Sequence, residues 1–513
     1  MLEGCEGEIL VELEKAVRNF DPDFILIPNS KFAVNYVSER AKANGLKLSL
    51  SRGLAVEGRW VDFNGRVVLD LRCFEEFGLA GIAELCNYSM LPPELAVGWP
   101  VGRLVDSRQC YEAIRRNVLL PVARSPSTAF RSLSEFHMAD KGGLTFNPKV
   151  GVYENVCQLD FDSQYPNIIV KHNISYETVI DVGSVLREPR GFLAEITEYW
   201  LNRRLHFKRL AKTLPEGNLK IYAYQRQKAL KAVLVVVYGY SGCSWNRFAN
   251  VKCFEEINRI SRKILIDALN VAEEEGFEVI YADVDSIYVH KAGAKLEDYE
   301  ELRNLIVDET GLPMSIENWF KFIAFLPQQT NSGLSATKRY FGKLMSGELC
   351  FKGIEARRYD YPEYVKEVQL RMMETLFDAE DLSEVASNVD RVLGVLAKAV
   401  KALIEKRVPV EKLVVYKALH KDPREYSSMF PHVSAALQLM QHGYEVEVGD
   451  LIGYIHVRSR SKNQLTRVQA AQLVTGYYDA EKYIEMLVEA AETILSPLKI
   501  DKAQVRATLV GLR

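Results

Sequence analysis

The alternation of hydrophobic and polar positions predicts a mixed α/β structure for the first part of the chain. Over the first ~120 residues, short apolar runs such as FILIP and RVVLDL alternate with amphipathic stretches such as GLAGIAELCNYSML. A loop-rich stretch, PVARSPSTAF, and a glycine pair at Gly142–Gly143 follow. A chain of 513 residues exceeds what one hydrophobic core supports, so we expect several domains or subdomains.

The middle of the chain predicts a strand followed by a helical hairpin. The segment VCQLDFDSQYPNII (156–169) has the composition of a buried strand that runs into a turn at Tyr165–Pro166. Two long helical patterns, at about 191–213 and 220–238, are separated by a tip that contains proline and glycine. Together they predict an antiparallel helical hairpin.

The pattern downstream of the hairpin predicts one more helix (254–275) and then a very apolar strand–turn–strand, FEVIYADVDSIYVH. Beyond about residue 365 the pattern is mainly helical, with a short β element near 446–459. We find no internal repeat.

The composition is that of an ordinary globular protein, with 48% hydrophobic and 26% charged residues and a formal net charge of −3. The eight cysteines occur singly and form no CxxC pair, which argues against a zinc or iron–sulfur module and against a disulfide framework. A reducing, intracellular setting is therefore expected. The sequence contains neither a membrane-length apolar stretch nor the features of a signal peptide, so we expect no membrane partner.

Acidic residues occur at the ends of two of the predicted strands. Asp160 follows an apolar run, and Asp283 and Asp285 flank Val284 in IYADVDSIYV. Charges beside apolar strands are costly to bury unless a cation compensates them, and paired carboxylates can bridge two Mg²⁺ ions for phosphoryl transfer. If 281–289 is one strand, its period of two places Asp283 and Asp285 on the same face. The alternative is a tight turn with solvated aspartates.

Basic residues are concentrated in the predicted hairpin, between Arg203 and Lys231. On the second helix, Gln227, Lys231, Val235 and Tyr238 share one face, and on the first helix Arg204 and Lys208 are one turn apart. Two helices that present cations toward a common cleft would form an electrostatic clamp for a triphosphate. The alternative is an exposed basic hairpin with a solvated face.

These segments resemble the conserved motifs of B-family DNA polymerases. LDFDSQYPNII resembles motif A, RQKALKAVLVVVYGY resembles motif B, and YADVDS resembles motif C. TKRY (337–340) with KGIEARRYD (352–360) resembles the strand near the primer terminus, and 423–455 resembles the thumb signature. The motifs follow the family order, so the resemblance implies an α+β multidomain, right-hand polymerase (palm, fingers, thumb) with a truncated RNase H-like exonuclease remnant at the N-terminus.

The resemblance also implies boundaries for these parts. They are a degenerate, truncated 3′→5′ exonuclease-like domain (1–120), the first part of the palm (121–195), the fingers hairpin (196–238), the second part of the palm (239–365) and the thumb (366–513).

The resemblance implies a two-metal catalytic centre. Asp160 and Asp285 would ligate two Mg²⁺ ions, with Mn²⁺ as a possible substitute, and the carbonyl of Phe161 would help. Asp283 would lie close by as a weaker ligand.

For the substrates, the resemblance implies contacts to the nucleotide and to DNA. Tyr165 would be the steric gate against ribonucleotides, and Tyr238 would line the pocket of the nascent base pair. The residues implied to hold the triphosphate are Arg204, Lys208 and Lys231, and those implied to contact the primer–template duplex are Lys338, Arg339 and Tyr340.

Some positions depart from the family pattern. Val235 and Val236 stand where the family usually has Asn-Ser, in a valine run that forms helix poorly. Gln164 replaces the usual Leu of motif A, and Val284 replaces the usual Thr of motif C. None of these changes removes a metal ligand, so we expect lower efficiency or altered fidelity and not inactivity.

The exonuclease motifs are degenerate. In the segment 21–48, which resembles the second motif, Ala33 follows Phe32 where the family has Asp. Near the third motif Gly102 stands in place of Tyr while Asp106 survives, and the first motif has no candidate because the chain begins downstream of its place. We therefore expect no 3′→5′ exonuclease activity, a remnant that supports the palm, and a helix N-cap or surface-charge role for Asp106.

The pattern, which also shows no counterpart of the uracil-sensing N-terminal domain, resembles the minor, exonuclease-degenerate branch of archaeal B-family polymerases. The leading hypothesis is a nucleoid-associated cytoplasmic polymerase that adds dNTPs to a primer on template DNA, used in repair or translesion synthesis. The alternative is a catalytically impaired scaffold that binds DNA; a nuclease lacks the required carboxylates. A sliding clamp is a possible partner, although the C-terminal AQVRATLVGLR shows no clear clamp-binding peptide.

Overall fold

A computed structural model describes residues 4–509 except 54–58, 123–131, 134–141, 329–333 and 475. The chain divides into two compact units, each assembled from separate stretches of sequence. We call Met1–Gly142 with Ser163–Lys263 the helical unit, and Gly143–Asp162 with Ile264–Arg513 the sheet unit. The predicted five-part division stays a prediction, and most of the loop-rich stretch expected at 121–130 lies outside the described residues.

The N-terminal part of the helical unit has the expected α/β alternation. Two short parallel strand pairs, β1 with β4 and β2 with β3, are joined by helices. A small core around Leu10, Ala41 and Leu48 lies beneath α1 and α2. The elements are α1 (Glu6–Phe20), β1 (Phe24–Ile27), α2 (Ser30–Ala43), β2 (Leu48–Ser49), β3 (Val61–Asp62) and β4 (Val67–Asp70).

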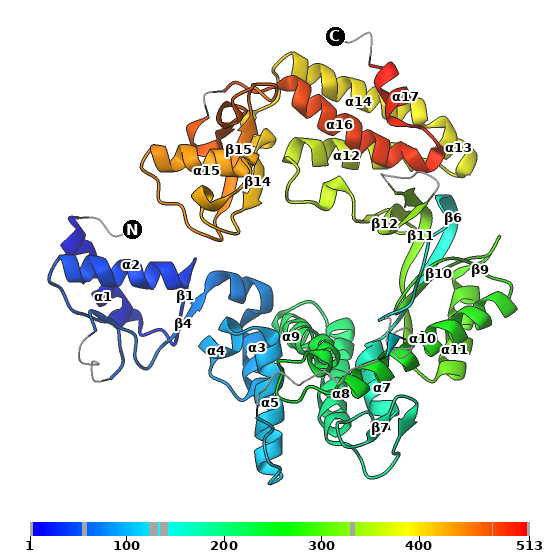
Figure 1. Cartoon of the computed structure of the whole chain (residues 1–513), viewed down its shortest axis with the longest axis horizontal. Helices are drawn as coiled ribbons and strands as arrows, with labels where there is room; N and C mark the ends of the chain where they lie inside the picture. Colours follow the sequence, from blue (N-terminus) through cyan, green and yellow to red (C-terminus); the bar gives the residue numbers. More distant parts are fainter. Residues whose placement is uncertain are drawn as a thin grey trace. The chain divides into compact units, whose positions relative to one another are not determined.

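The rest of the helical unit is built around the long helix α9 (Asn218–Gly242), against which α3, α5, α7 and α8 pack (Figure 1). These helices are α3 (Leu71–Ser89), α4 (Pro93–Gly98), α5 (Val101–Arg115), α7 (Gln164–Lys171) and α8 (Phe192–Thr213), with a strand pair β7 (Val179–Asp181) and β8 (Ser184–Val185). Helices α8 and α9 confirm the predicted hairpin. Pro215 comes directly after the residue that caps α8, where the helix cannot continue.

The sheet unit contains a seven-stranded antiparallel sheet in the order β13-β12-β11-β6-β10-β9-β5 (Figure 1). Strand β6 lies in the middle of this sheet, so the buried side chains of its second half alternate between two covered faces. The strands are β5 (Thr145–Phe146), β6 (Gly151–Phe161), β9 (Glu278–Asp283), β10 (Ser286–His290), β11 (Met314–Pro327), β12 (Ser335–Leu344) and β13 (Leu349–Lys352).

Helices cover the rest of the sheet unit. Helix α11 (Leu296–Thr310) packs on β11, and α10 (Val251–Glu274) begins in the helical unit and ends in the sheet unit. The C-terminal helices share one core with Phe322 and Phe341 of the sheet. They are α12 (Glu363–Leu376), α13 (Leu382–Ser387), α14 (Val389–Ile404), α16 (Ala480–Leu495) and α17 (Lys502–Ala507).

A second, smaller core of the sheet unit lies between α15 (Pro431–Gln441) and a three-stranded sheet. The strands are β14 (Val415–Ala418), β15 (Leu451–His456) and β16 (Val468–Ala470). The short β element predicted near 446–459 is thus confirmed as β15, and the sequence pattern missed its partners β14 and β16.

The turn predicted at Tyr165–Pro166 is wrong, because both residues lie in the first turn of α7. Proline is tolerated there since the first backbone N–H groups of a helix have no intrahelical acceptor. The chain turns instead at Asp162–Ser163, where Ser163 has a φ of 53°.

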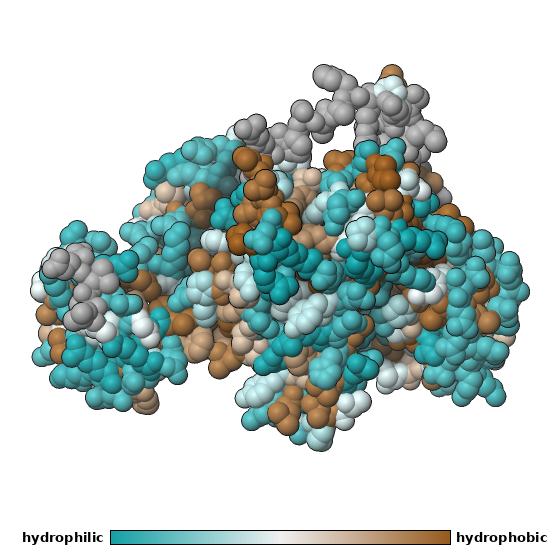
Figure 2. All heavy atoms as spheres, turned by 90° about the horizontal axis from the view of Figure 1, so that it is seen from below, coloured by the Kyte–Doolittle hydropathy of each residue, from teal (hydrophilic) through white to brown (hydrophobic). Residues whose placement is uncertain are grey.

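No helix of the described residues is long and apolar enough to cross a membrane. On the face shown in Figure 2, exposed apolar side chains form several separate patches among polar ones.

Candidate active site

Three aspartates lie at the same end of the neighbouring strands β6, β10 and β9 of the large sheet. Ser286, the first residue of β10, is paired in register with Asp160 on β6 and with Asp283 on β9. Asp285 directly precedes Ser286 and lies in the turn that joins the two strands. We call Asp160, Asp283 and Asp285 the carboxylate cluster.

The turn itself differs from the expected single strand. Val284 has a φ of 59°, a left-handed conformation that is strained for a β-branched residue, and the N–H of Asp285 donates to the carbonyl of Asp283 at 2.7 Å. The prediction that 281–289 is one strand with Asp283 and Asp285 on the same face is therefore wrong. The alternative of solvated aspartates is also wrong for Asp283, which is only 9% exposed.

Backbone hydrogen bonds fix the position of this turn. The N–H of Phe161 donates to the carbonyl of Asp285 at 2.8 Å, and the N–H of Val284 donates to the carbonyl of Leu144 at 3.0 Å. The first of these bonds ties the end of β6 to the turn. Asp160 and Asp285 are thus anchored to each other through the backbone of their neighbours.

The electrostatics of the cluster favour a cation. Burial raises the pKa of Asp285 above its ordinary value, and the neighbouring charge of Asp283 raises it further. Asp283 itself accepts a hydrogen bond from the Thr145 hydroxyl at 3.0 Å and forms an ion pair with Lys338 at 3.4 Å. A metal ion bound beside Asp285 would compensate the negative charge that burial and Asp283 disfavour.

The cluster fits a divalent ion that keeps open coordination positions. Mg²⁺ commonly uses one or two carboxylates and takes its other ligands from water and substrate phosphates. Asp160 and Asp285, with the Phe161 carbonyl, offer that donor set. Within the described part of the chain, no group of three or more His, Cys, Asp or Glu side chains could hold a metal ion, so strand register brings the three aspartates near one another without forming a closed cage.

A column of stacked aromatic rings occupies the helical unit near the start of α7. Tyr165 stacks on Tyr238 with ring centroids 4.0 Å apart and 10° between the planes, and Tyr238 stacks on Phe254 at 4.8 Å. The Tyr238 hydroxyl donates to Asn258 at 2.5 Å. We call Tyr165, Tyr238 and Phe254 the aromatic column. It places the predicted steric gate and the predicted base-pair residue in direct contact.

The predicted triphosphate residues lie on the hairpin. Arg204 is buried and donates to the Ser163 hydroxyl, which holds α8 to the start of α7. Lys208 is half-buried, and Lys231 is exposed on α9. Helix α9 continues without a break through the valine run, and Val235 is 60% exposed on the face that carries Lys231.

The basic run of the hairpin is not one functional face. Arg203 and Arg226 form ion pairs with Glu84 of α3, and Lys228 donates to the carbonyl of Glu76 at 2.6 Å. Three of the nine basic residues from Arg203 to Lys231 therefore bind α3, so a fully solvated face does not describe the run. The clamp by Arg204, Lys208 and Lys231 stays a prediction.

The three residues expected to contact the duplex lie on β12, and they differ in exposure and in their bonding partners. Lys338 is exposed with a φ of 59°, and its ammonium group pairs with Asp283. Arg339 donates to the Gly353 carbonyl at 2.9 Å. Tyr340 is 6% exposed, and its hydroxyl lies 3.1 Å from that of Tyr288 in the core. A DNA contact by the Tyr340 side chain thus has little support from its position, and those of Lys338 and Arg339 stay predictions.

The degenerate exonuclease positions fall on two helices. Ala33 lies on α2, Gly102 lies near the start of α5, and Asp106 lies within α5. Asp106 accepts a hydrogen bond from the Tyr240 hydroxyl of α9 and lies 3.8 Å from Arg247. The expected N-cap or surface role is therefore wrong, because the carboxylate joins two helices.

The sequence analysis missed two residues that bind predicted site elements: Glu84 binds the hairpin in the helical unit, and Thr145 binds Asp283 in the sheet unit. Glu84 is the single acid in the apolar helical stretch GIAELC. An acid at a position expected to be buried could have indicated a buried ion pair. Thr145 carried no such signal. Within the helical unit α3 and α5 pack on α9, and the expected support of the palm by the N-terminal remnant stays a prediction.

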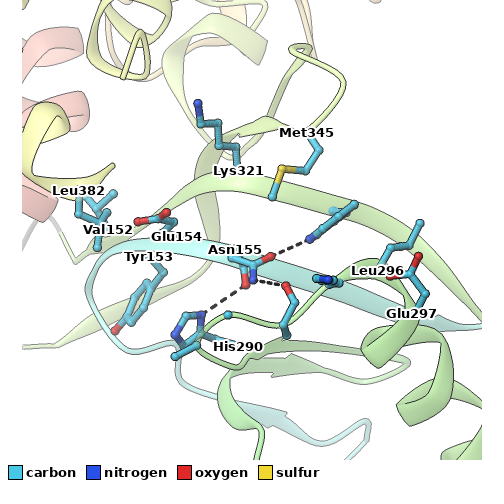
Figure 3. Close-up of a pocket in the computed structure, with 15 residues that line it drawn as sticks. Val152, Tyr153, Glu154, Asn155, His290, Leu296, Glu297, Lys321, Met345 and Leu382 are labelled. Carbon is cyan, nitrogen blue, oxygen red and sulfur yellow. Dashed lines mark hydrogen bonds between the residues drawn. The ribbon is translucent and has the colours of Figure 1, made fainter. Parts of the chain in front are cut away.

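A pocket of about 870 Å³ in the sheet unit lies at the opposite end of β6 from Asp160 (Figure 3). Asn155 is one of the lining residues labelled in Figure 3, and its amide donates to the Ala294 carbonyl at 2.8 Å and accepts from the Trp319 indole at 2.9 Å. None of the carboxylate cluster lines this pocket.

Comparison with known proteins identifies a family. The family model for "DNA polymerase family B" matches residues 110–189 and 184–498. "DNA polymerase 2" of Aeropyrum pernix is 30% identical over an alignment of 443 positions that covers 83% of this chain and 52% of that protein. "DNA polymerase 1" of Pyrococcus abyssi is 27% identical over an alignment of 575 positions that covers 96% of this chain and 72% of that protein.

The solved structure of the family B DNA polymerase from Pyrobaculum calidifontis matches 95% of this chain and 72% of its own, with a TM-score of 0.70 and 26% identity. The chain spans about half the length of the Aeropyrum pernix relative and 40% of a "DNA polymerase" of Archaeoglobus fulgidus that is 31% identical.

Proposed function

The chain belongs to DNA polymerase family B, and from this premise we propose that it is a template-directed DNA polymerase that adds dNTPs to a primer 3′-hydroxyl and lacks 3′→5′ proofreading. The observation that carries the proposal is the register of β6, β9 and β10, which brings Asp160 and Asp283 to either side of Ser286, with Asp285 next to it. A fold that only bound DNA would have no need to gather three acids at a sheet edge where a duplex phosphate would be repelled.

The parts of the molecule take their roles from the family. The large sheet would be the palm, α8 and α9 the fingers, and residues 366–513 the thumb. The first ~120 residues would be the exonuclease-like part, as the short parallel strand pairs and the degenerate motifs suggest.

The carboxylate cluster would act on the reacting groups. When bound, two divalent ions activate the primer hydroxyl and stabilise the leaving oxygen. Asp160 and Asp285 would hold those ions, with the Phe161 carbonyl as a further oxygen donor. The backbone bond from Phe161 to Asp285 keeps both carboxylates in place, so little reorganisation is required when the ions and substrate arrive.

The helical unit would bind the nucleotide. Lys208 and Lys231 supply positive charge for a triphosphate, and Arg204 helps to fix the start of α7, which carries Tyr165. Tyr165 is held flat against Tyr238, and a ring fixed in this way would clash with a 2′-hydroxyl rather than move aside.

The absence of proofreading rests on the residues at the exonuclease positions. Ala33 and Gly102 have no side-chain ligand atoms, and the carboxylate of Asp106 is engaged by Tyr240. Two-metal hydrolysis needs several carboxylates at one point. A role in repair or translesion synthesis, within the cytoplasmic nucleoid and as a member of the exonuclease-degenerate archaeal branch, follows from lost proofreading together with Val235 and Val236. It is an extension of the proposal, as is a sliding clamp; the last four residues of AQVRATLVGLR lie outside the described residues.

Primer extension on a template with Mg²⁺ and dNTPs tests the function, with Asp160→Ala as the matched control. Extension by the parent that is lost in the control, with no shortening of the primer when dNTPs are withheld, supports a polymerase without proofreading. A DNA gel shift without extension would favour the scaffold hypothesis. Primer shortening would contradict the proposed loss of proofreading.

A further inference from the structure

Glu84 is a buried acid of the helical unit, and it binds two arginines at once. Its side chain is 1% exposed on α3, and both of its oxygens are used. Arg203 of α8 donates to it through Nε and, at 3.1 Å, through Nη2, while Arg226 of α9 donates at 2.9 Å. One carboxylate of the N-terminal segment therefore holds both helices of the hairpin.

The surroundings of this carboxylate are closely packed. The guanidinium groups of Arg203 and Arg226 lie over the ring of Phe207 at 5.0 and 5.2 Å. Glu84 is buried while Arg203 and Arg226 are 29% and 34% exposed. Charge-assisted bonds to a buried carboxylate are strong, and removal of the arginines would leave its charge uncompensated. The contact is thus specific in geometry and not a loose surface pair.

The backbone of α3 also lies directly against α9. Gly78 has a φ of 64°, and a Cβ at this position would lie 2.1 Å from the Gln225 side chain. The N–H of Ala80 donates to Gln225 at 3.3 Å, and Lys228 reaches the Glu76 carbonyl. Only glycine fits this approach, so α3 and the start of α9 interlock over more than one turn.

Helix geometry connects this contact to the nucleotide residues. Successive residues of an α-helix are separated by about 100° of rotation around its axis. Arg204 directly follows Arg203 on α8, and Lys231 comes five residues after Arg226 on α9. The rotation of each helix about its own axis therefore sets the direction of these side chains. A contact that fixes Arg203 and Arg226 therefore fixes the faces that carry Arg204, Lys208 and Lys231.

We propose that Glu84 is a positioning residue for the incoming dNTP, which it serves by setting the rotation of α8 and α9. This inference rests on the proposed function. The exonuclease-like segment then contributes to nucleotide binding through α3, although it contributes no ligand of its own to the reaction.

The test compares Glu84→Gln and Glu84→Asp with Glu216→Gln, which removes an 88% exposed acid paired with Lys220 in the same hairpin. Steady-state extension gives KM for dNTP and kcat, and fluorescence anisotropy gives the Kd for primer–template DNA. Hydrogen exchange of 203–213 and 218–231 in the DNA-free protein reports the hairpin without any need for activity. For Glu84→Gln we expect at least about a tenfold higher KM for dNTP, kcat and DNA Kd within threefold, and faster exchange in both helices. Glu84→Asp keeps the charge and should fall between, and Glu216→Gln should match the parent.

An unchanged KM would overturn the proposal, whether or not exchange is faster, because faster exchange alone indicates only a structural brace. A KM that rises together with an equal loss of DNA affinity would also overturn it, since that pattern indicates general misfolding. If the parent extends no primer, the proposed function fails separately. Calorimetric titration with dNTP and Mg²⁺ then decides: weaker binding by Glu84→Gln than by the parent supports the proposal, and equal or undetectable binding by both contradicts it.

Discussion

The hydroxyl of Tyr240 on α9 donates a hydrogen bond to the carboxylate of Asp106 on α5. Tyr240 is 2% exposed, and burial, with the bond to Asp106, raises the pKa of its hydroxyl well above the ordinary value, so it remains a donor at any physiological pH. Asp106, which the sequence resemblance places in the third exonuclease motif, thus joins two helices of the helical unit. This structural role requires no metal.

Replacement of Asp106 by alanine should destabilise the protein without any effect on exonuclease activity. A hydrogen bond to a charged group contributes about 1.5–3 kcal/mol, and the buried Tyr240 hydroxyl would be left without this acceptor. Urea unfolding of Asp106→Ala, Tyr240→Phe and the double variant measures the coupling. We expect each single change to lower the free energy of unfolding by about 2 kcal/mol and the double change to add little more. Fully additive losses would show that the two side chains act independently.

Asp285 and Asp283 should respond differently to removal of their charge. Asp285→Asn takes away a proposed ligand of both ions, and we expect extension to fall by at least about 100-fold at any Mg²⁺ concentration. Asp283→Asn should lose less, because Asp283 is also bound by Thr145 and Lys338. Magnesium titrations of the extension rate measure both, with Asp181→Asn, an exposed carboxylate, as control. Equal losses for the two variants would mean that Asp283 is a full ligand.

Tyr165→Ala should weaken the discrimination against ribonucleotides. Loss of the ring opens the end of the aromatic column, and we expect the ratio of kcat/KM for dCTP over CTP to fall by about 100-fold. Tyr165→Phe keeps the ring and its stack on Tyr238, so it is the matched control and should retain the parent ratio. If the alanine variant still rejects CTP, another residue acts as the gate.

The sheet unit should lose stability in mild acid. Burial lowers the pKa of His432 to about 4, helped by Lys417 and His420, and burial lowers that of His456 to about 4, helped by Lys482 and opposed by Asp479. The pKa of histidine in an unfolded chain is about 6.5. Between this value and about 4, the unfolded chain binds more protons than the folded chain, so the free energy of unfolding decreases as the pH is lowered.

The loss should reach at most about 1.4 kcal/mol per pH unit for each histidine. Urea unfolding from pH 7 to pH 4 measures it, and His456→Phe should reduce the slope while a change at the exposed His442 should not. A slope that is the same in all three proteins would contradict the assignment to His456.

The features that could be predicted from the sequence are those that a local residue pattern encodes. The hairpin and the strand 156–161 follow from apolar periodicity and from residues adjacent in the chain. The contacts of Glu84 with Arg203 and Arg226 join residues far apart in sequence, and no local pattern specifies such a pairing. Val284 shows the opposite limit, because its left-handed φ overrides the extended preference of a β-branched residue and converts an apparent strand into a turn.

The central place of β6 in the sheet has a consequence for synthesis on the ribosome. Its two partners, β10 and β11, leave the ribosome only after α8, α9 and α10, so this apolar strand is made long before it can be paired. Unpaired apolar strands invite association with other chains. This strand, which carries Asp160 and ends at Phe161, therefore stays unpaired until β10 emerges, and a chain released before Ser286 would lack both partners and should aggregate.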